Sequence, residues 1–558
     1  MNIFYNSTNK YSKKADFKLI SLLTVFLSIV FIVTLNSRQL VSGDETRVAG
    51  ISAQTAVYGN WAKPELNGKD FLEKPPLFFW ADALSIKLFK NTPLGARLPS
   101  ALMAIIGALS IFIFMKKMKY SDISAFSSSV ILATSAQYWE YGHKCMIDMM
   151  LAVFIGIALL AFKTYCNANS GKEKLLYFMI YTAGLAGGLM SKGLIGIAIP
   201  ISAIGAYLFF THIWLRKPEK WSTWIVFILG VILSFIPFSI WILVLYKEAG
   251  YNAVYRIVWT NNFGRFTGSH AEHIEPVYYY LLKIFEQLQP WTIILPIALW
   301  FHFKQIFKEK KKNSLFFLCA LIIPYVMLSM AAGKRQVYIL PLYAFEAILI
   351  GSTLGHFWDW NKQKNDKFKL TIIIKFLRNI FPVIFTITGV VCIVLSILKE
   401  LNAIWLIIPS LLIIFSLISL ILNLKKHSFA MPLLFIAFGF LFASIDCVFM
   451  NLVNNKYSYI PLFTYVKNLK EKGEPIVLLQ AHERLRGAAV FYLGEKIPEQ
   501  TFKQLKNNIQ NNTINKNIYI YNGGKQVRLP EKINNMKIIK NFKVGKKYQL
   551  LLKNMDSQ

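Results

Sequence analysis

Residues 222–246 read STWIVFILGVILSFIPFSIWILVLY and contain no charged side chain. A helix of about 20 apolar residues crosses the hydrocarbon core of a bilayer, so this stretch predicts a transmembrane helix. The composition of the whole chain agrees, because 55% of its 558 residues are hydrophobic, more than is typical of soluble domains. The sequence therefore predicts an integral membrane protein and excludes a soluble globular one.

Further apolar segments lie on both sides of this stretch, and they predict an α-helical polytopic membrane protein with about 13 transmembrane helices. The predicted segments are 19–36, 98–115, 121–137, 147–165, 174–190, 193–213, 222–246, 291–303, 314–331, 338–356, 378–398, 403–422 and 429–450.

The net charge of +33 is concentrated in the gaps between these segments. Basic clusters occur in every second gap, as the positive-inside rule requires of cytoplasmic loops. This pattern places the N-terminus in the cytoplasm and the C-terminus outside, and it accounts for the charge without a nucleic-acid partner. The clusters are Lys10/Lys13/Lys14/Lys18, Lys116/Lys117/Lys119, Lys172/Lys174, Arg216/Lys217/Lys220, Lys304 with Lys308–Lys312, Lys362–Lys369 and Lys425/Lys426.

Polar sequence on the outer side falls into two long loops, 37–97 and 247–290, and a tail, 454–558. The tail alternates short apolar runs with Lys- and Asn-rich helical stretches, which predicts a small α/β domain. We therefore expect a transmembrane domain over 1–453, which includes both loops, and a separate soluble domain over 454–558. HERLRG at 482–487 is interpreted as a solvated helix face.

The first loop combines helical spacing with turn signals. Asp44 and Arg47 are three residues apart, which places them on one helix face. Gly59-Asn60 predicts the end of that helix and Asn67-Gly68 a tight turn. In Glu73-Lys74-Pro75-Pro76, the prolines disfavour helix at Lys74 and fix the start of the next one. We expect this loop to lie on the membrane surface with Asp44, Arg47, Glu73 and Lys74 near one site.

At this loop the sequence resembles a known family. DETR (44–47), YGNWAKPELNG (58–68), FLEKPPLFFWADALSIKLF (71–89) and ARLPSAL (96–102) are similar to the first periplasmic loop of the lipid-carrier-dependent C-type (GT-C) glycosyltransferases. The likeness is greatest to the bacterial aminoarabinose (4-amino-4-deoxy-L-arabinose) lipid A transferases of the ArnT family, within the wider group that resembles the dolichyl-phosphate-mannose-protein mannosyltransferases. It continues in IDMM (147–150), SKG (191–193), NNFGRFTG and EHIEPVYYYL (261–281) and GKRQVYILPLY (333–343).

The resemblance implies an inverting glycosyltransferase of the bacterial inner membrane with its active site facing the periplasm. Such an enzyme moves a sugar from a polyprenyl (undecaprenyl) phosphate carrier to an envelope acceptor. The favoured reaction is transfer of aminoarabinose, or a related amino sugar, to a lipid A phosphate. This chemistry requires cations that stabilise the leaving phosphate and a site that excludes water.

Outer-face cations meet the first requirement, and the family motifs imply which of them contact the donor phosphate. The alternative is that lysine and arginine at helix ends merely reach the lipid headgroups. Their recurrence at motif positions on one face favours phosphate binding. The implied donor phosphate-binding residues are Arg47, Lys74, Lys192, Arg265, Lys334 and Tyr338.

Three acids are implied as catalytic: Asp44, Asp148 and Glu73. If the acceptor is a hydroxyl, one carboxylate has to act as general base. A lipid A phosphate is already ionised and needs no base, in which case the acids orient groups or hold a metal. For Asp148, a structural ion pair with Lys144 or His143 is the competing interpretation.

A divalent metal, zinc, is a weaker expectation. The family's second loop carries a Glu-His pair where this chain has Asn261 and Asn262, so that histidine is missing. Glu73 and His273 remain as a metal pair, but two protein ligands are fewer than zinc usually has.

Two alternatives stay open. The same reaction could use another glycolipid, a polysaccharide or a protein hydroxyl as the acceptor. The asparagines at the positions of the family's Glu-His pair leave this alternative open. A secondary transporter is less favoured, because transporters place polar groups near the bilayer midplane, whereas here they gather in the outer loops.

Overall fold

The computed structural model describes residues 11–41, 43–264, 274–360, 370–401, 403–425, 430–510, 517–525, 527 and 536–554. The chain forms two compact units. The first comprises Met1–Val33, Glu73–Leu77 and Ser100–Ile445, and the second comprises Thr34–Leu72, Phe78–Pro99 and Asp446–Gln558.

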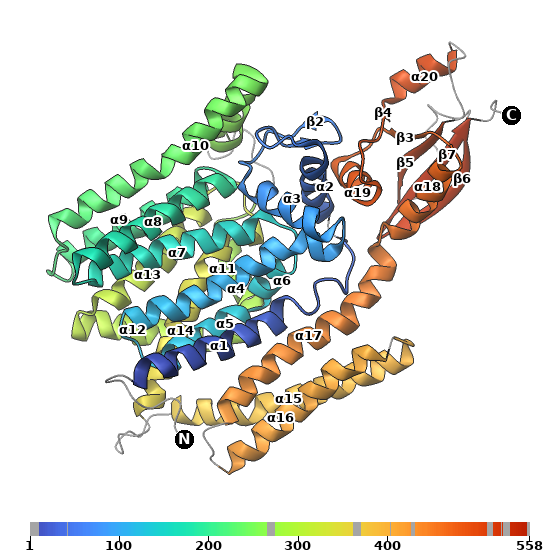
Figure 1. Ribbon diagram of the computed structural model, residues 1–558. Coiled ribbons are helices and arrows are strands. Elements are labelled where there is room, and N and C mark those ends of the chain that lie inside the picture. Colours follow the sequence, from blue (N-terminus) through green and yellow to red (C-terminus); the bar gives the residue numbers. More distant parts are fainter. Residues whose placement is uncertain are drawn as a thin grey trace. The chain divides into compact units, whose positions relative to one another are not determined.

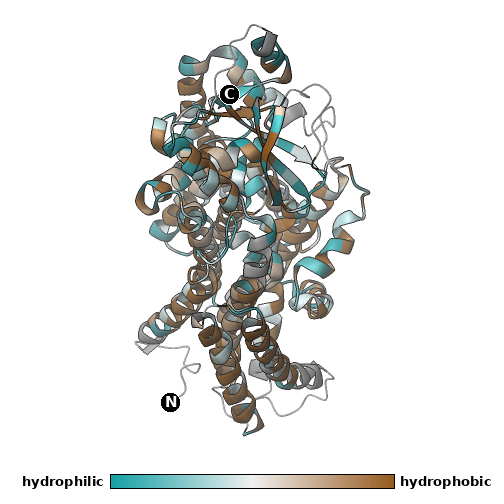
Figure 2. Cartoon of the chain, turned by 90° about the vertical axis from the view of Figure 1, so that its right-hand side faces the viewer, coloured by the Kyte–Doolittle hydropathy of each residue, from teal (hydrophilic) through white to brown (hydrophobic). Residues whose placement is uncertain are grey.

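The first unit is a bundle of apolar helices that run side by side (Figure 1) and are coloured mostly hydrophobic in Figure 2. Two of its helices, α4 and α17, continue into the second unit. Its elements are α1 (Tyr11–Phe31), α4 (Pro93–Lys117), α5 (Asp122–Ala133), α6 (Ala136–Gly142), α7 (Ile147–Asn167), α8 (Gly171–Lys192), α9 (Ile195–Ile213), α10 (Trp221–Tyr255), η1 (Arg256–Gly264), α11 (Tyr279–Gln287), η2 (Trp291–Ile293), α12 (Leu295–Glu309), α13 (Lys312–Met330), η3 (Gln336–Leu342), α14 (Tyr343–Trp360), α15 (Leu370–Leu398), α16 (Ile404–Leu424) and α17 (Ala430–Tyr457).

Helix α10 shows why this bundle requires a membrane. It contains the uncharged stretch 222–246, and isoleucines spaced three or four residues apart along it are exposed. Such spacing places them on one helix face. A continuous apolar face of this kind is unfavourable in contact with water. The protein itself leaves this face uncovered, so lipid has to cover it. The exposed isoleucines are Ile225, Ile228, Ile232, Ile236 and Ile240.

Among the described residues the predicted membrane segments overlap helices, but 19–36 extends past the end of α1 at Phe31 and 121–137 includes the break between α5 and α6. Eight helical stretches there are long and apolar enough to cross a membrane, and two shorter helices are also apolar. The prediction for 291–303 is wrong at its start, because residues 291–293 form the short 3-10 turn η2 and the helix α12 begins at Leu295 and extends to Glu309. The chain is a multi-pass membrane protein.

The second unit contains a five-stranded mixed sheet with strand order β4-β3-β5-β7-β6. The parallel pairs β3–β4 and β3–β5 need crossover connections, and the chain supplies α19 and α20 for them. The antiparallel strands β5, β7 and β6 complete the sheet. The bounds are α18 (Ile460–Glu471), β3 (Ile476–Leu479), α19 (Glu483–Leu493), β4 (Glu499–Gln500), α20 (Phe502–Gln510), β5 (Ile518–Gly524), β6 (Met536–Val544) and β7 (Lys547–Asn554).

The central strands β3, β5 and β7 of this sheet are covered on both faces, which explains the short continuous apolar runs of the tail. Leu478 and Ile520 pack with α18 and α19 on one face, while Leu479 and Tyr519 pack with Leu505 of α20 on the other. A strand covered on both faces reads as an unbroken apolar run rather than an alternating one. The apolar run at 488–493 is different, because it lies within the helix α19.

The first loop has the local structure that its sequence predicts. Its elements are α2 (Gly43–Tyr58), the hairpin of β1 (Glu65–Leu66) and β2 (Lys69–Asp70), and α3 (Leu77–Phe89). Gly59 follows α2 with φ +75°, and the hairpin turn holds Asn67 and Gly68 at φ 54° and 77°, the left-handed values that such turns require. The prolines directly precede α3.

The division between the units differs from the predicted one at residues 453 and 454. Most of the first loop packs with the C-terminal residues, because α2 and α19 meet with their backbones in close approach. A Cβ added at Gly50 would lie 2.5 Å from the Cα of Gly487, and one added at Gly487 would lie 2.3 Å from the carbonyl oxygen of Thr46. Only glycine fits on both sides of this contact.

Candidate active site

In the first unit, the motif lysine Lys192 and the motif acid Asp148 form an ion pair. Lys192 is the last residue of α8, which ends because Gly193 adopts φ 79°. Asp148 lies in the first turn of α7, where the helix dipole favours a negative charge. The Lys192 Nζ donates a hydrogen bond to Asp148 Oδ1, and the two side chains are only 14% and 9% exposed. The fold thus places a cation and an acid together at two helix ends.

Tyr338 completes this cluster. It lies in η3, and the centroid of its ring is 4.7 Å from the Lys192 Nζ, within the range of a cation–π contact. The structure therefore brings together three of the predicted site residues, Asp148, Lys192 and Tyr338. The competing interpretation, in which Asp148 pairs with Lys144 or His143, is wrong, since Lys144 pairs with Glu140 and the His143 ring bonds to the Trp139 carbonyl.

Lys334 is buried, with 3% of its surface exposed. Its Nζ donates a hydrogen bond to the carbonyl oxygen of Glu275 at 2.7 Å, and the adjacent Gly333 pairs with Ile274 in a short β-bridge. Lys334 thus ties the end of the second loop to the start of η3. An ammonium group has three N–H donors, so this bond leaves others for a ligand.

In the second unit, Arg47 lies between two acids. Its Nη2 donates to Asp44 Oδ1 at 3.1 Å, which is the predicted contact along one helix face. Its Nη1 donates to Glu483 Oε2 of α19 at 2.8 Å, and its guanidinium lies 5.7 Å from the Phe71 ring centroid. The interpretation of HERLRG as a solvated helix face holds only in part, because Glu483 is 44% exposed and Arg484 is exposed, whereas Leu485 and Gly487 are buried where α19 packs on α2.

Two other charged motif residues, Glu45 and Arg97, have a structural function. Glu45, from DETR, and Arg97, from ARLPSAL, form a fully buried ion pair with Nε to Oε1 at 2.7 Å. Arg97 also donates to the backbone carbonyls of Leu35, Arg38 and Gln39. Most of the donors of Arg97 are thereby satisfied, as a buried guanidinium requires. The pair fixes the start of the loop that carries Asp44.

Comparison with known proteins places this geometry in context. The profile of the family described as dolichyl-phosphate-mannose-protein mannosyltransferase matches residues 73–241. An undecaprenyl phosphate-alpha-4-amino-4-deoxy-L-arabinose arabinosyl transferase of Proteus mirabilis is 29% identical over 333 residues, which are 59% of this chain and 58% of the relative. A transferase of the same name from Erwinia tasmaniensis is 26% identical over 340 residues, again 59% and 58%. The match thus spans less than two thirds of the length of these relatives.

The solved structures extend the likeness along the chain. ArnT from Cupriavidus metallidurans bound to undecaprenyl phosphate matches with a TM-score of 0.75 and 17% identity, over 96% of this chain and 98% of that one. The chain has the fold of a C-type (GT-C) glycosyltransferase. The resemblance to the ArnT family predicted from the motifs is confirmed.

Other predicted site residues fall in different units or lie outside the described residues. Glu73 and Lys74 are half-buried in the turn before α3 and belong to the first unit, whereas Asp44 and Arg47 belong to the second. Their predicted meeting at one site stays a prediction. Arg265 and His273 lie outside the described residues.

Asn261 of the second loop is one of the two asparagines that the resemblance places where a Glu-His pair is expected. Asn261 lies in the π-helical segment η1, and its Nδ2 donates to the Arg256 carbonyl at 2.9 Å. An amide can make this local bond, but it brings no charge to a metal or a sugar. Among the residues that the structure describes, no three His, Cys, Asp or Glu side chains are grouped as a metal site would need.

Sequence reasoning missed Glu483 as a partner of Arg47. The only signal for it in the sequence is the charged stretch HERLRG, 436 residues further along the chain. A contact at that separation is decided by the packing of α2 on α19 and has no local signature.

Proposed function

We propose that this chain is an inverting glycosyltransferase that moves a sugar from a polyprenyl (undecaprenyl) phosphate carrier to an acceptor in the bacterial envelope. The observation that carries the proposal is the cluster of Lys192, Asp148 and Tyr338 at the ends of apolar helices. A carrier phosphate whose prenyl chain stays in lipid would reach a cation at such a position. The names of the relatives, which specify an undecaprenyl phosphate donor and arabinosyl transfer, support the same reaction.

The proposed chemistry is a single displacement at the anomeric carbon of the donor sugar. The acceptor oxygen forms a bond to that carbon while the bond to the carrier phosphate oxygen breaks, and the phosphate leaves with the electron pair. Negative charge grows on the leaving phosphate, so a fixed cation lowers the barrier. Lys192 is suited to this task because Asp148 and the Tyr338 ring hold its flexible side chain in place.

The acceptor decides what the acids do. A lipid A phosphate is already ionised at neutral pH, so its oxygen attacks without losing a proton, and Asp148 then positions Lys192. A hydroxyl acceptor has to transfer its proton to a carboxylate, for which Asp44 or Asp148 is the proposed base. We favour aminoarabinose, or a related amino sugar, as the donor group and lipid A phosphate as the acceptor.

The proposed location is the bacterial inner membrane, with the N-terminus in the cytoplasm and the site facing the periplasm. The alternation of basic clusters along the sequence supports this orientation. Lys192 and Lys334 then lie on the outer side, and the basic loops lie inside. The C-terminal tail follows on the outer side.

Zinc bound by Glu73 and His273 stays a prediction. Glu73 is the only one of the two that the structure describes, and the mechanism above routes no step through a metal. The test is activity of the purified chain after treatment with a chelator and re-addition of zinc. Loss and recovery would support the metal, and full activity in the chelator would remove it.

The proposed function is tested with the full chain in proteoliposomes that contain undecaprenyl phosphate aminoarabinose and lipid A. Mass spectrometry should detect lipid A that has gained one pentosamine. We expect Lys192→Gln to lower the rate by about 100-fold or more, the usual effect of removing a preorganised charge-stabilising group. Lys172→Gln is the matched control, because Lys172 lies at the opposite end of the same helix and is exposed.

The outcomes separate the alternatives. Pentosamine on lipid A that depends on Lys192 and not on Lys172 supports the proposal. Transfer to a different envelope glycolipid would replace the acceptor and keep the reaction. Absence of any transfer from a chain that still unfolds cooperatively would overturn the transferase and favour transport.

A further inference from the structure

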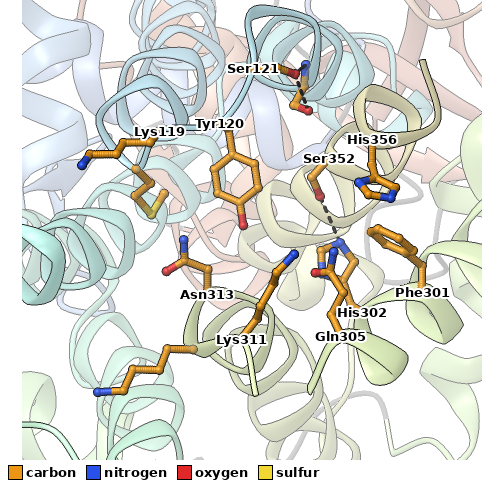
Figure 3. Close-up of a pocket in the computed structure, with 13 residues that line it drawn as sticks. Lys119, Tyr120, Ser121, Phe301, His302, Gln305, Lys311, Asn313, Ser352 and His356 are labelled. Carbon is orange, nitrogen blue, oxygen red and sulfur yellow. Dashed lines mark hydrogen bonds between the residues drawn. The ribbon is translucent and has the colours of Figure 1, made fainter. Parts of the chain in front are cut away.

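A pocket lies in the first unit, away from the candidate active site. Its volume is about 440 Å³, within the usual range for small-ligand sites. Four helix ends surround it: the turn between α4 and α5, the second half of α12, the start of α13 and the second half of α14. Figure 3 shows Tyr120 on one side of the hollow and His302 and Ser352 on the other, with Lys311 directed between them and Lys119 at the edge, its ammonium group directed outward.

Helix α7 shows where this pocket lies in the bundle relative to the candidate active site. Asn313, which lines the pocket, accepts a hydrogen bond from Asn167, the last residue of α7, at 3.3 Å. Asp148 lies in the first turn of the same helix. A helix of 21 residues is about 30 Å long, so the pocket and the Lys192–Asp148 pair lie on opposite sides of the bundle. The pocket is therefore separate from the proposed donor site.

The lining of the pocket is basic and rich in hydrogen-bond donors. Among the residues that the structure describes, the lining includes Lys119, Lys311 and Lys312 and no aspartate or glutamate. Lys311 and Lys312 each contact an acid outside the lining, Glu309 at 2.7 Å and Glu219 at 3.0 Å. Lys119 is exposed at the rim. The combination of ammonium groups with hydroxyl and amide donors is the one that binds phosphate.

The inner wall of the pocket is held by a network of buried polar side chains. His302 is 1% exposed, and its Nδ1 and Nε2 bond to the hydroxyls of Ser314 and Ser352, each at 3.0 Å. Ser314 donates in turn to Gln305 Oε1 at 2.6 Å. These bonds connect α12, α13 and α14 and fix the shape of the wall before a ligand arrives. Helices that packed here only through apolar side chains would not form these hydrogen bonds.

Lys119 stands at a backbone position that favours glycine. Its φ is +65°, two residues after the end of α4 at Lys117, in the region where a left-handed residue usually ends a helix and is usually glycine. Lys310, at φ +50°, ends α12 in the same way but does not line the pocket. The two lysines therefore form a matched pair, alike in backbone conformation and different in access to the pocket.

We propose that this pocket binds the phosphate of an anionic lipid headgroup from the membrane leaflet on its side of the bundle. Basic pockets between transmembrane helices are known to select such headgroups. A zwitterionic lipid headgroup carries a positive charge as well as a phosphate. The lysines repel that positive charge, so such a lipid should bind less well. A free phosphate ion shares the recognised group, and the experiment has to distinguish the two.

The experiment is native mass spectrometry of the full chain in detergent, titrated with dioleoylphosphatidylglycerol, dioleoylphosphatidylcholine or inorganic phosphate. We expect one phosphatidylglycerol to bind in preference to phosphatidylcholine. Lys119→Gly should weaken that binding about tenfold, as expected for one lost hydrogen bond to a charged group. The same change should leave the unfolding temperature equal or higher, since glycine suits φ +65°. Lys310→Gly should bind like the wild type.

Three results would overturn the proposal. Unchanged binding by Lys119→Gly would remove the pocket as the site. An equal loss in Lys310→Gly would show that general surface charge attracts the lipid. Displacement of the lipid by millimolar inorganic phosphate, with the same dependence on Lys119, would reject the lipid and leave a soluble phosphate site.

Discussion

Lys192 and Asp148 meet as an ion pair although 44 residues separate them, and each stands at the end of an apolar helix. Water reaches little of either charged group, because the Lys192 and Asp148 side chains are only 14% and 9% exposed. The two charges are therefore stabilised mainly by each other. An ammonium held in this way is already in position when a donor phosphate arrives. A free surface lysine would first have to give up its rotational freedom.

Asp148→Asn should lower kcat/KM for the lipid-linked donor by about 100-fold, because Lys192 loses the carboxylate that positions it. A rate assay with varied donor concentration measures the change. Asp122→Asn is the control, since Asp122 also lies in the first turn of an apolar helix and also pairs with a lysine, Lys116. Comparable losses in both variants would mean that any such acid is needed for the fold, and a role in positioning would be rejected.

Glu45→Gln should destabilise the protein by about 3–5 kcal/mol, the usual cost of leaving one partner of a buried ion pair uncompensated. Arg97 is fully buried and would keep its charge without Glu45. Thermal unfolding of the detergent-solubilised chain tests this expectation. Glu286→Gln breaks an exposed pair with Lys283 and should change stability by less than about 1 kcal/mol. Similar unfolding temperatures for the two variants would contradict the assigned role of Glu45.

Gly487→Ala should destabilise the contact between α2 and α19 by about 1–3 kcal/mol, as overpacking usually does. Its new Cβ would lie 2.3 Å from the Thr46 carbonyl oxygen and 2.7 Å from the Arg47 Cα, and backbone atoms cannot rotate away. Gly205→Ala, inside α9 with no atom within 4 Å of its added Cβ, should be neutral or stabilising. A stable Gly487→Ala chain would show that the two helices separate easily.

Stability should fall as the pH drops below about 6.5, because of His482. Burial lowers the pKa of His482 below its usual 6.5, so the unfolded chain takes up the proton first and gains from it. The neutral ring also accepts a hydrogen bond from the Leu485 N–H through Nδ1 and so caps α19, a bond that protonation removes. The loss should begin near the unfolded pKa and end below the folded one.

The control for this pH effect is His482→Asn, because asparagine caps helices well and does not titrate. Unfolding temperatures measured between pH 5 and pH 7.5 should show a smaller pH dependence for this variant than for the wild type. An identical pH dependence would assign the effect to other groups.

Local sequence was sufficient for features that depend on neighbouring residues. The three-residue spacing of Asp44 and Arg47 predicted their contact, and Asn67-Gly68 predicted the hairpin turn. Hydropathy located the helices of the bundle, because the cost of exposing a peptide group to lipid leaves the helix as the only solution for an apolar segment. Boundaries were less certain, as the late start of α12 shows.

The sequence by itself determined that this chain is a polytopic membrane protein, because apolar length is a local property, and its short motifs carried the resemblance that implied a C-type glycosyltransferase fold. Tertiary structure alone decided that Lys192 meets Asp148 and that Arg47 is shared with Glu483. It also decided that Glu45 and Arg97 are scaffold residues rather than members of the site. These pairs are tens to hundreds of residues apart along the chain, and only helix packing, which depends on every residue of the contact, brings their charges together.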